Sequence, residues 1–333
     1  MTSLDGTVLV SGGAGYIGSH TVRALREAGR GVVVLDTLEF GRRQAVIDAP
    51  LVVGDIADRD LVTATCNEHG VTQVVHFAAY KAVGESMLIP AKYFRNNVLG
   101  TVELVEACLA AGVKDIVFSS SCSVQGTPAT VPVTEDMPIQ PESVYAESKA
   151  MVERILHWYG QTSDVRSVSL RYFNAAGASF DGRLGETWER TFNLIPLAMK
   201  AVIAKERRLQ VFGDDYDTPD GTCIRDYIHV VDLADAHVRS LEYLADGGKT
   251  MTVGVGTGVG SSVLEVLDAV AAAAGKPVPY DIAPPRAGDP VASYADPSRA
   301  HELLGWTAKY GLTEIVESAY AWHKAQFDAG NVR

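Results

Sequence analysis

A run of closely spaced glycines near the start of the chain restricts its possible folds more than any other feature. Gly12, Gly15 and Gly18 directly follow an apolar segment at residues 7–10 and open a segment, residues 16–28, whose apolar side chains recur at helical spacing. Gly12 permits a tight turn, Gly15 lets a phosphate approach the backbone, and Gly18 lets a helix pack closely on the preceding strand. Unpaired N–H groups at the start of such a helix attract an anion. The run therefore predicts a strand–turn–helix unit that binds a dinucleotide.

An acidic residue stands where such a unit needs one. Asp36 follows a second apolar run, residues 32–35, and lies 21 positions after Gly15. A carboxylate there accepts hydrogen bonds from the hydroxyls of the adenosine ribose and repels a 2′-phosphate, so the sequence predicts NAD rather than NADP. The alternative is an ordinary glycine turn followed by a solvated aspartate.

The first half of the chain continues to alternate short apolar runs with longer amphipathic segments. Further strands are predicted at residues 51–53, 73–77, 115–119 and 165–171. Helices are predicted at residues 58–68, capped by Asp58, and at 96–111 and 142–159. Continuous apolar strands separated by helices indicate an α/β fold, a doubly wound parallel sheet of the Rossmann type.

The second half loses this rhythm, which predicts a separate lobe. Residues 175–226 are richer in Gly, Pro and charge and are predicted to form loops and helices. We assign residues 1–174, with about 227–250, to the dinucleotide-binding domain. We assign about 175–226 and 251–333 to a smaller α/β substrate-binding lobe. A length of 333 residues is enough for two such units.

Composition argues against several kinds of partner. With 29 Lys and Arg against 41 Asp and Glu the net charge is −12, which suits neither a nucleic acid nor an anionic membrane surface as main partner. The sequence has no apolar run of transmembrane length, and its first five residues do not resemble a signal peptide. None of the four cysteines lies in a CxxC motif, and no histidine pair has the spacing of metal ligands. We expect a reduced, cytoplasmic protein without a metal site.

The candidate catalytic groups are a tyrosine and a lysine on one predicted helix. Tyr145 and Lys149 lie four residues apart within residues 142–159 and therefore share a face. A free tyrosine has a pKa near 10, and a lysine ammonium together with a nicotinamide cation would lower that pKa. Tyr145 could then take a proton from a substrate hydroxyl as hydride leaves the carbon. A serine cluster at residues 119–121 could bind the same oxygen. Alone, these residues also fit an exposed helix pair and a polar strand end.

Several longer motifs spread over nearly the whole chain. They read SGGAGYIGSHT, HFAAYKAVGES, FSSS, LRYFNAAGA, GTCIRDYIHVVDLADAHV and PPRAGD. With these motifs and the Tyr145/Lys149 pair, the chain resembles the extended short-chain dehydrogenase/reductase superfamily and, within it, the UDP-glucose 4-epimerase family, from about residue 7 to residue 322. The resemblance implies Tyr145 as base, Lys149 as its activator and a ribose ligand, and Ser121 as hydroxyl partner. It also implies tightly bound NAD, a UDP-hexose substrate and a homodimer.

The resemblance implies a set of contacts for each ligand. For NAD these are Gly12, Gly15, Tyr16, Ile17, Gly18, Asp36, Thr37, Asp55, Ile56, Phe77, Ala78, Ala79, Lys81, Asn96, Tyr145, Lys149 and Tyr172. For the nucleotide sugar they are Lys81, Ser121, Tyr145, Asn174, Asn193, Leu194, Phe212, Arg225, Arg286, Asp289 and Ser293. Arg225 and Arg286 suit a pyrophosphate because guanidinium groups chelate phosphate oxygens, although a surface ion pair would also fit them. The small Ser293 borders the C2 substituent of the sugar and implies that N-acetylated sugars are also accepted.

The implied reaction is a reversible oxidation at sugar C4, after which the keto sugar turns and hydride returns to its other face. The chain departs from the family pattern at Gln125, where an aromatic residue is usual, and in the short segment 37–41. Related dehydratases carry an Asp-Glu pair where this chain has Cys122 and Ser123. The alternatives are a 4-epimerase of a uronate or pentose nucleotide, a dehydrogenase that releases NADH, and a non-catalytic NAD-binding sensor.

Overall fold

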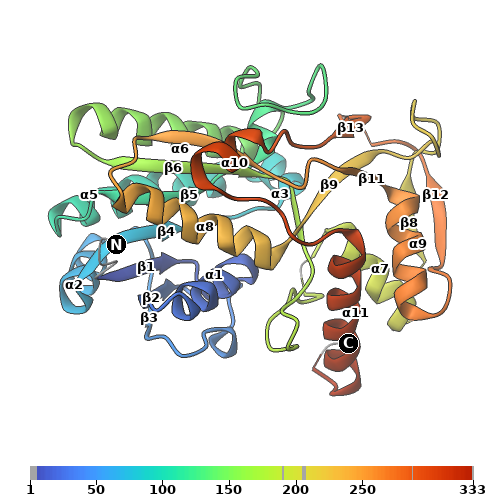
Figure 1. Ribbon diagram of the computed structural model, residues 1–333, viewed down its shortest axis with the longest axis horizontal. Coiled ribbons are helices and arrows are strands. Elements are labelled where there is room, and N and C mark those ends of the chain that lie inside the picture. Colours follow the sequence, from blue (N-terminus) through green and yellow to red (C-terminus); the bar gives the residue numbers. More distant parts are fainter. Residues whose placement is uncertain (1–5, 190, 205–207, 287, 332–333) are drawn as a thin grey trace.

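A seven-stranded parallel sheet runs through the larger part of the molecule (Figure 1). The computed structural model describes residues 6–189, 191–204, 208–286 and 288–331. From edge to edge the strands are β10 (Met251–Val255), β6 (Arg166–Tyr172), β5 (Asp115–Ser119), β4 (Val71–His76), β1 (Thr7–Ser11), β2 (Gly31–Asp36) and β3 (Leu51–Val53). The winding direction reverses between β1 and β4, as in a doubly wound sheet. The predicted fold class is confirmed.

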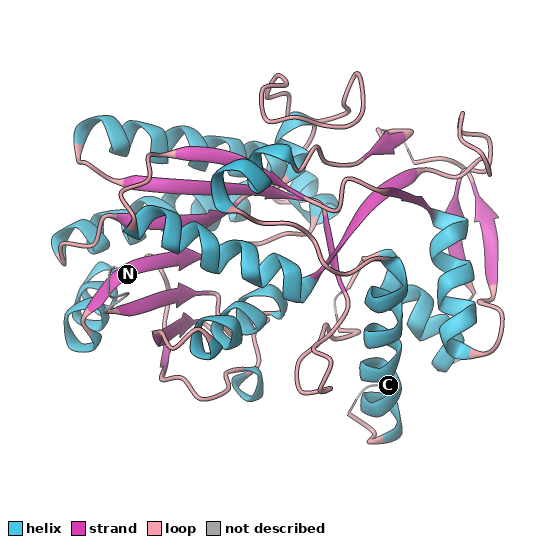
Figure 2. Ribbon diagram, viewed as in Figure 1, coloured by secondary structure: helices cyan, strands magenta, loops and turns pink. Residues whose placement is uncertain are grey.

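Helices cover both faces of this sheet (Figure 2). One face carries α1 (Tyr16–Glu27) and α8 (Val230–Ala245), and the other carries α2 (Arg59–His69), α5 (Gly100–Ala110) and α6 (Val144–Thr162). Within β1, Val8 and Val10 belong to the core under α1 and α8, whereas Leu9 belongs to the core on the other face. Successive side chains of a strand point to opposite faces. Burial on both faces explains why the predicted strands are continuous apolar runs.

Most element ends follow local signals in the sequence. The Asp58 carboxylate accepts a hydrogen bond from the Leu61 N–H at 3.0 Å and caps α2, which ends at Gly70 with a φ of 59°. The helix predicted at residues 96–111 differs from the prediction. Its first part belongs to a π-helical segment, η2 (Phe94–Leu99), and the α-helix α5 begins only at Gly100. Apolar spacing cannot distinguish these two hydrogen-bonding patterns.

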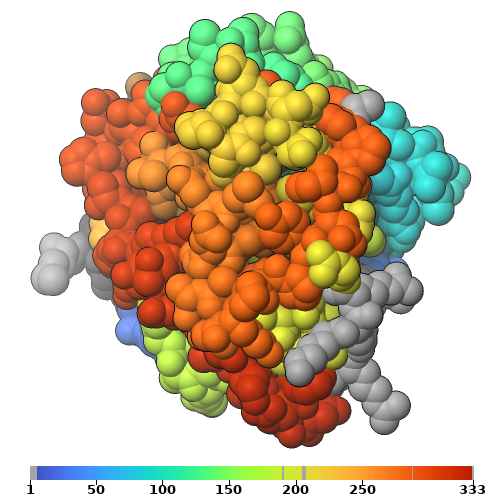
Figure 3. Space-filling view, turned by 90° about the vertical axis from the view of Figure 1, so that its right-hand side faces the viewer, coloured from blue at the N-terminus to red at the C-terminus, as the bar shows by residue number. Residues whose placement is uncertain are grey.

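The smaller lobe is built around a third core, at the right of Figure 1. Its helices are α7 (Leu194–Ile203), α9 (Val263–Ala274) and α11 (Leu312–Asp328). Its strands are β7 (Asn174–Ala176), β8 (Leu209–Phe212), β9 (Ile224–His229), β11 (Gly260–Ser262), β12 (Tyr280–Ala283) and β13 (Ala292–Ser293). Residues 175–226 thus contribute strands as well as the predicted loops and helices, and these strands are too short to show a clear alternation. Seen from its own end, the lobe's surface consists mainly of segments beyond residue 200, coloured yellow to red (Figure 3).

Two segments that we assigned to the lobe pack on the large sheet instead. β10 pairs with β6 along its whole length, and Val253 and Val255 are buried in the core beneath α8. α10 (Ser298–Leu304) contacts α8 and β10, and Trp306 is fully buried in the same core. The assignment of these residues is therefore corrected, because their partners lie far away in the sequence. Residues 1–5 and 332–333, at the two ends of the assigned ranges, lie outside the described residues. The prediction that the chain does not start with a signal peptide concerns residues 1–5 and so falls outside them too.

The remaining elements are short. They are η1 (Arg43–Ala45), α3 (Val83–Leu88), α4 (Pro90–Tyr93) and η3 (Cys122–Gln125). Among the described residues, no helix is both long enough and apolar enough to cross a membrane.

Candidate active site

The glycine run forms the turn between β1 and α1 at the carboxyl ends of the parallel strands. Gly12 has a φ of 75°, a conformation that glycine adopts without strain. A Cβ on Gly18 would lie 2.3 Å from the Gly12 carbonyl oxygen, so the strand and the helix approach as closely as predicted. Gly15 is the residue before α1 and has no side chain to cover the first N–H groups of the helix. These groups are therefore available to a phosphate.

The chain after Asp36 wraps around its carboxylate. The Ala14 N–H donates to Oδ2 at 3.0 Å and the Leu38 N–H donates to Oδ1 at 2.8 Å. A Cβ on Gly41 would lie 2.7 Å from Oδ1, so the segment 37–41 packs tightly here. Burial raises the pKa of Asp36, and these two hydrogen bonds oppose the rise. Each carboxylate oxygen has a second lone pair for a ribose hydroxyl.

Other predicted NAD contacts lie at the same edge of the sheet. The N–H groups of Phe77 and Ala78 both donate to the Ser11 carbonyl, at 2.9 and 3.1 Å, which holds the end of β4 against the glycine turn. Asp55 is exposed and its carboxylate accepts from the Ala57 N–H at 2.9 Å. Asn96 lies on η2 and its amide donates to the Asn97 side chain at 2.9 Å. The structure therefore brings Phe77 and Ala78 to the glycine turn, whereas the side-chain bonds of Asp55 and Asn96 are local.

Tyr145, Lys149 and the serine cluster meet where α6 crosses the end of β5. Ser121 lies near the hydroxyl of Tyr145 and lowers the pKa of that group. The Lys149 Nζ donates to the Ser119 carbonyl at 2.7 Å and lies 6.0 Å from the centroid of the Tyr145 ring. The hydroxyl of Tyr172 is 2.6 Å from the Ser119 hydroxyl. Five residues that the sequence singled out are thus within one cluster.

Burial dominates the electrostatics of this cluster. It raises the pKa of Tyr145 well above the usual value, and Ser121 opposes the rise. It also lowers the pKa of Lys149 to about 7. We expected the lysine cation to lower the pKa of the tyrosine, and in this structure that effect does not prevail, because desolvation disfavours the charged form of both groups. A further cation beside the phenol would be needed to ionise it near neutral pH.

The predicted substrate contacts form two groups, of which the first lies at the mouth of the lobe. Asn174, Asn193 and Leu194 line one pocket together with Tyr227. The Asn193 amide donates to the buried Glu186 at 3.0 Å, and the Lys81 Nζ lies 3.6 Å from the same Glu186 oxygen. Glu186 therefore links a residue of the large domain with one of the lobe, and sequence reasoning did not identify it.

The second group surrounds Arg225 on β9. The Arg225 guanidinium lies 3.6 Å from the Asp289 carboxylate and donates to the Pro290 carbonyl at 2.8 Å. Ser293 on β13 is the direct neighbour of Arg225 in the strand register. Arg286 stacks over the Phe212 ring, with its guanidinium carbon 3.8 Å from the centroid. Arginines that are partly paired within the protein can still present free N–H groups to phosphate oxygens.

Gln125, a departure from the family pattern, has a structural role. Its side-chain amide donates to the Thr134 carbonyl at 2.6 Å, and it is buried. This bond ties η3 to the loop that follows it. Gln125 therefore affects local packing, and it leaves the contact between Ser121 and Tyr145 intact.

Sequence reasoning also missed a buried ion pair behind the catalytic cluster. Glu153 on α6 binds Arg171 on β6, with atoms as close as 2.6 Å. Glu153 follows Lys149 by four residues, so helical spacing places both on one face and offered a signal. Arg171 carried no such signal, because its partner is distant in the sequence.

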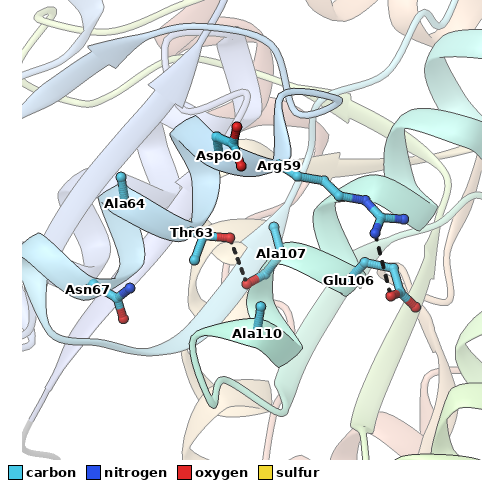
Figure 4. Close-up of a pocket in the computed structure, with 8 residues that line it drawn as sticks. All are labelled: Arg59, Asp60, Thr63, Ala64, Asn67, Glu106, Ala107 and Ala110. Carbon is cyan, nitrogen blue, oxygen red and sulfur yellow. Dashed lines mark hydrogen bonds and ion pairs between the residues drawn. The ribbon is translucent and has the colours of Figure 1, made fainter.

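A hollow on the outer surface lies apart from these residues, between α2 and α5 (Figure 4). Small side chains such as Ala64 and Ala110 line it, and an ion pair of 3.8 Å between Arg59 and Glu106 lies at its side. None of the predicted site residues lines it. In the part of the chain that the structure describes, no group of three or more His, Cys, Asp or Glu is placed to hold a metal ion.

Comparison with known proteins matches this chain over nearly its full length. The model of the NAD dependent epimerase/dehydratase family matches residues 8–256. A UDP-glucose 4-epimerase of Rhizobium meliloti (strain 1021) is 45% identical over 326 residues, which cover 98% of this chain and 99% of that protein.

Solved structures give the same result. The UDP-glucose 4-epimerase of Stenotrophomonas maltophila, with bound NAD and formylated UDP-arabinopyranose, is 40% identical with a TM-score of 0.95 and covers 98% of this chain and 100% of that one. The UDP-glucose 4-epimerase of Brucella ovis, in complex with NAD, is 44% identical with a TM-score of 0.94 and covers 96% of this chain and 99% of that one.

Proposed function

Because this chain belongs to the NAD-dependent epimerase/dehydratase family, we propose that it interconverts UDP-glucose and UDP-galactose by transient oxidation at sugar C4. The observation that carries the proposal is the cluster of Tyr145, Lys149 and the serines that follow β5, at the sheet edge that also holds the glycine turn. A base, a hydroxyl donor and a dinucleotide cradle then face one space. The nearly complete match to UDP-glucose 4-epimerases supports it.

The residues present fit NAD. The backbone cradle at Gly12 and Gly18 would be filled by any Cβ, and the Asp36 carboxylate stands at the end of β2 where a ribose is expected. NAD, when bound, supplies the acceptor and later the donor of hydride. Lys149, with its amino group directed at the Ser119 carbonyl, is placed beside Tyr145 to hold a ribose hydroxyl.

The protein's own part in the reaction is to move one proton and to hold the nucleotide. The Tyr145 oxygen takes the proton of the sugar 4-hydroxyl and later returns it. The Ser121 hydroxyl binds the same sugar oxygen and keeps it in line. Arg225 and Arg286 bind the pyrophosphate, while Asn174 and Asn193 bind the nucleotide side of the ligand. Firm nucleotide contacts and few sugar contacts let the keto sugar turn between the two hydride transfers.

The test is a product assay on purified protein with UDP-galactose and no added NAD. We expect UDP-glucose to appear without free NADH. Conversion that requires added NAD and accumulates NADH would instead identify a dehydrogenase that releases its cofactor. The absence of any product, with NAD added, would refute the proposal and favour an NAD-binding sensor.

A pentose nucleotide is the second candidate substrate. The specific observation is that the Stenotrophomonas maltophila structure holds formylated UDP-arabinopyranose. The same assay with a UDP-pentose and with a UDP-uronate decides between them, since the preferred substrate has the higher kcat/KM. Faster turnover of either sugar than of UDP-galactose would replace the hexose in the proposal.

N-acetylated hexoses extend the proposed range. Ser293 is small and lies directly beside Arg225 in the sheet, so a C2 substituent near it meets little bulk. We expect UDP-GalNAc to be converted, and Ser293→Tyr to lower that turnover by at least about tenfold while UDP-galactose is converted as before. If UDP-GalNAc is inert at enzyme levels that equilibrate UDP-galactose, the extension is wrong.

The assembly, location and domain division that we propose rest on weaker observations. A homodimer is suggested by two large apolar side chains on neighbouring elements, Leu99 at 53% and Trp158 at 65% exposure.

A cytoplasmic location fits four free cysteines, of which Cys66 and Cys108 share a hydrogen bond. The two-domain division, with β10 and α10 moved to the large domain, also stays a prediction. Limited proteolysis would test it, because cleavage is expected in exposed connections between the units.

A further inference from the structure

A buried polar network lies directly behind the Tyr145 and Lys149 pair. Arg171 donates to both oxygens of the Glu153 carboxylate, through Nε at 3.0 Å and Nη2 at 2.6 Å. Ser120 donates its hydroxyl to Glu153 Oε1 at 2.5 Å, and Arg171 Nη1 donates to the Glu135 carbonyl at 3.1 Å. Glu153 and Arg171 are both buried. The carboxylate thus joins α6 to the ends of β5 and β6.

Two members of this network, Ser120 and Glu153, lie next to proposed catalytic residues. Ser120 stands between Ser119, whose carbonyl accepts from Lys149, and Ser121, which lowers the pKa of Tyr145. Glu153 itself lies one helical turn beyond Lys149 on α6. A shift of the Glu153 carboxylate would therefore move the backbone that sets both contacts. Such displacements are costly in catalysis, because reacting groups must be held within a fraction of an ångström.

The network also supplies charge to the site. A buried ion pair is a weak source of stability, because desolvation offsets the attraction. Its local field is strong, and the negative charge of Glu153 opposes the effect of burial on the pKa of Lys149, which lies at about 7. Without that charge Lys149 would lose its proton at a lower pH.

Other groups around this end of α6 contribute little charge. The titratable side chains on the elements packed against it, or against Lys149, are His76 on β4, Glu85 on α3, Lys92 and Tyr93 on α4, Arg95 on η2, Asp115 on β5, Cys122 on η3, and Arg166, Arg171 and Tyr172 on β6; Asp115 and Arg166 form an ion pair with each other. Burial and the Lys149 cation lower the pKa of His76 to about 3, and burial raises the pKa of Tyr172 to about 12, so both are neutral near pH 7. Burial likewise keeps Cys122 and Tyr93 neutral. Glu85 is bound by Lys92 at 3.0 Å, and Arg95 is exposed.

We propose that Glu153 is a positioning residue of the reaction, which holds Ser119 and Ser121 against Lys149 and Tyr145 through Ser120 and keeps Lys149 protonated by its negative charge. The proposal rests on the proposed function for its kinetic consequence. The effect on Lys149 itself does not depend on the substrate. Three substitutions distinguish the geometric role of Glu153 from its electrostatic role.

Glu153→Gln removes the charge and keeps the size of the side chain. Glu153→Asp keeps the charge and shortens the reach, and Ser120→Ala removes the link to the serine cluster and leaves the charge in place. We expect all three to lower kcat per NAD-loaded site at pH 7 by tenfold or more, with KM for UDP-galactose changed by less than about threefold. Only Glu153→Gln should move the alkaline limb of the kcat profile, downward by about one pH unit.

A direct titration of Lys149 tests the electrostatic role of Glu153 without a measurement of turnover. In NAD-loaded protein labelled with [ε-¹³C]lysine, the Lys149 signal is the one that Lys149→Met removes. Its midpoint should fall by about one pH unit in Glu153→Gln and stay in place in Glu153→Asp and Ser120→Ala. Lys114→Met, at an exposed ion pair with Asp164, is the control for assignment.

The outcomes separate the two claims. Wild-type protein that converts no nucleotide sugar overturns the proposed function, and the lysine titration then still decides the electrostatic role of Glu153. An unmoved Lys149 midpoint in Glu153→Gln overturns that role. If all three variants retain the wild-type kcat per NAD-loaded site, Glu153 does not position the serines. A loss of thermal stability with unchanged kcat in the surviving fraction would show a structural role only, which also overturns the proposal.

Discussion

For the two proposed catalytic side chains, burial shifts the pKa more than neighbouring groups do. Tyr145 and Lys149 have pKa values shifted toward their neutral forms, because desolvation disfavours a charge inside the protein. The site therefore pairs a tyrosine whose pKa is well above the usual value with a lysine whose pKa is about 7. Its capacity for proton transfer depends on what else enters the site.

Replacing Tyr145 by Phe tests the base directly. The ring remains, and only the hydroxyl proposed as the base is lost. We expect kcat to fall by about 10² to 10⁴-fold, since that is the usual contribution of a positioned acid or base, while bound NAD stays stoichiometric. Tyr243→Phe is the control, because that hydroxyl accepts only a local bond from the Lys249 N–H at 3.1 Å. Full turnover by Tyr145→Phe would remove Tyr145 from the mechanism.

A buried histidine on α11 predicts a dependence of stability on pH. His323 is 2% exposed and stacks on Trp188 with ring centroids 5.3 Å apart. Burial lowers its pKa from 6.5 to about 3, so the unfolded chain binds the proton more tightly. Its contribution to stability is therefore complete above pH 6.5 and is lost, at up to about 1.4 kcal/mol per pH unit, as the pH falls toward 3.

The variant His323→Phe keeps an aromatic ring at this position and removes the group that titrates. Urea unfolding should give similar free energies for both proteins at pH 7.5. At pH 5.0 the variant should lose about 2 kcal/mol less than the wild type. An equal loss in both proteins between these two pH values would show that His323 is not buried in its neutral form.

At the scale of elements, the turn between β1 and α1 is set by how closely the backbone packs. A Cβ on Gly18 would meet the Gly12 carbonyl at 2.3 Å, and no side chain can move away to relieve that contact. The π-helical segment η2 shows a different local solution. It places Asn97, whose side chain binds the N–H and the carbonyl of Tyr80 at 2.9 and 3.0 Å, under the loop that follows β4.

Gly18→Ala should separate the helix from the strand. We expect loss of tightly bound NAD and destabilisation by more than about 2 kcal/mol, because backbone must shift at both ends of the contact. Gly84→Ala on α3 is the matched control, since its Cβ would enter open space, and its stability should change by less than about 1 kcal/mol. Thermal unfolding and the NAD content of the purified proteins are the measurements. Stoichiometric NAD in Gly18→Ala would refute the close-packing argument.

The whole molecule consists of the large sheet, with a core on each face, and the smaller lobe with its own core, and hydrogen bonds and ion pairs join the two units. The Tyr16 hydroxyl on α1 donates to the Gly177 carbonyl at 2.7 Å, and Arg23 binds Asp181 at 2.8 Å. These bonds hold the loop after β7 against the dinucleotide end. The two units therefore already touch beside the glycine turn.

The proposed dimer is a prediction for this scale. Trp158→Glu would place a charge at an exposed apolar side chain of the proposed dimer surface, and we expect it to yield monomers that retain NAD, because buried unpaired charge is costly. Leu303→Glu is the control, as Leu303 on α10 is exposed to 45% and lies on another element. Light scattering after gel filtration gives the mass. A wild-type monomer, or a Trp158→Glu dimer, would contradict the proposed surface.

By itself, the sequence determined the features that depend on near neighbours in the chain. The strands of the large sheet before β10, the caps, the glycine turn and the pairing of Tyr145 with Lys149 on one helical face follow from spacing and local conformation. The NAD and nucleotide-sugar contacts were predicted from the family resemblance, because the resemblance rests on contiguous motifs.

Only the tertiary structure decided what depends on distant partners. β10 and α10 belong to the large sheet because of β6 and α8, and the Glu153–Arg171 pair exists because α6 crosses β6. Glu186 joins Lys81 to Asn193 for the same reason. Burial, which sets the pKa values of Tyr145 and Lys149, is likewise a property of the packed molecule. The local sequence pattern determines which residues share one face of a helix or strand. The residues that pack against that face come from distant parts of the chain, and a local pattern does not identify them.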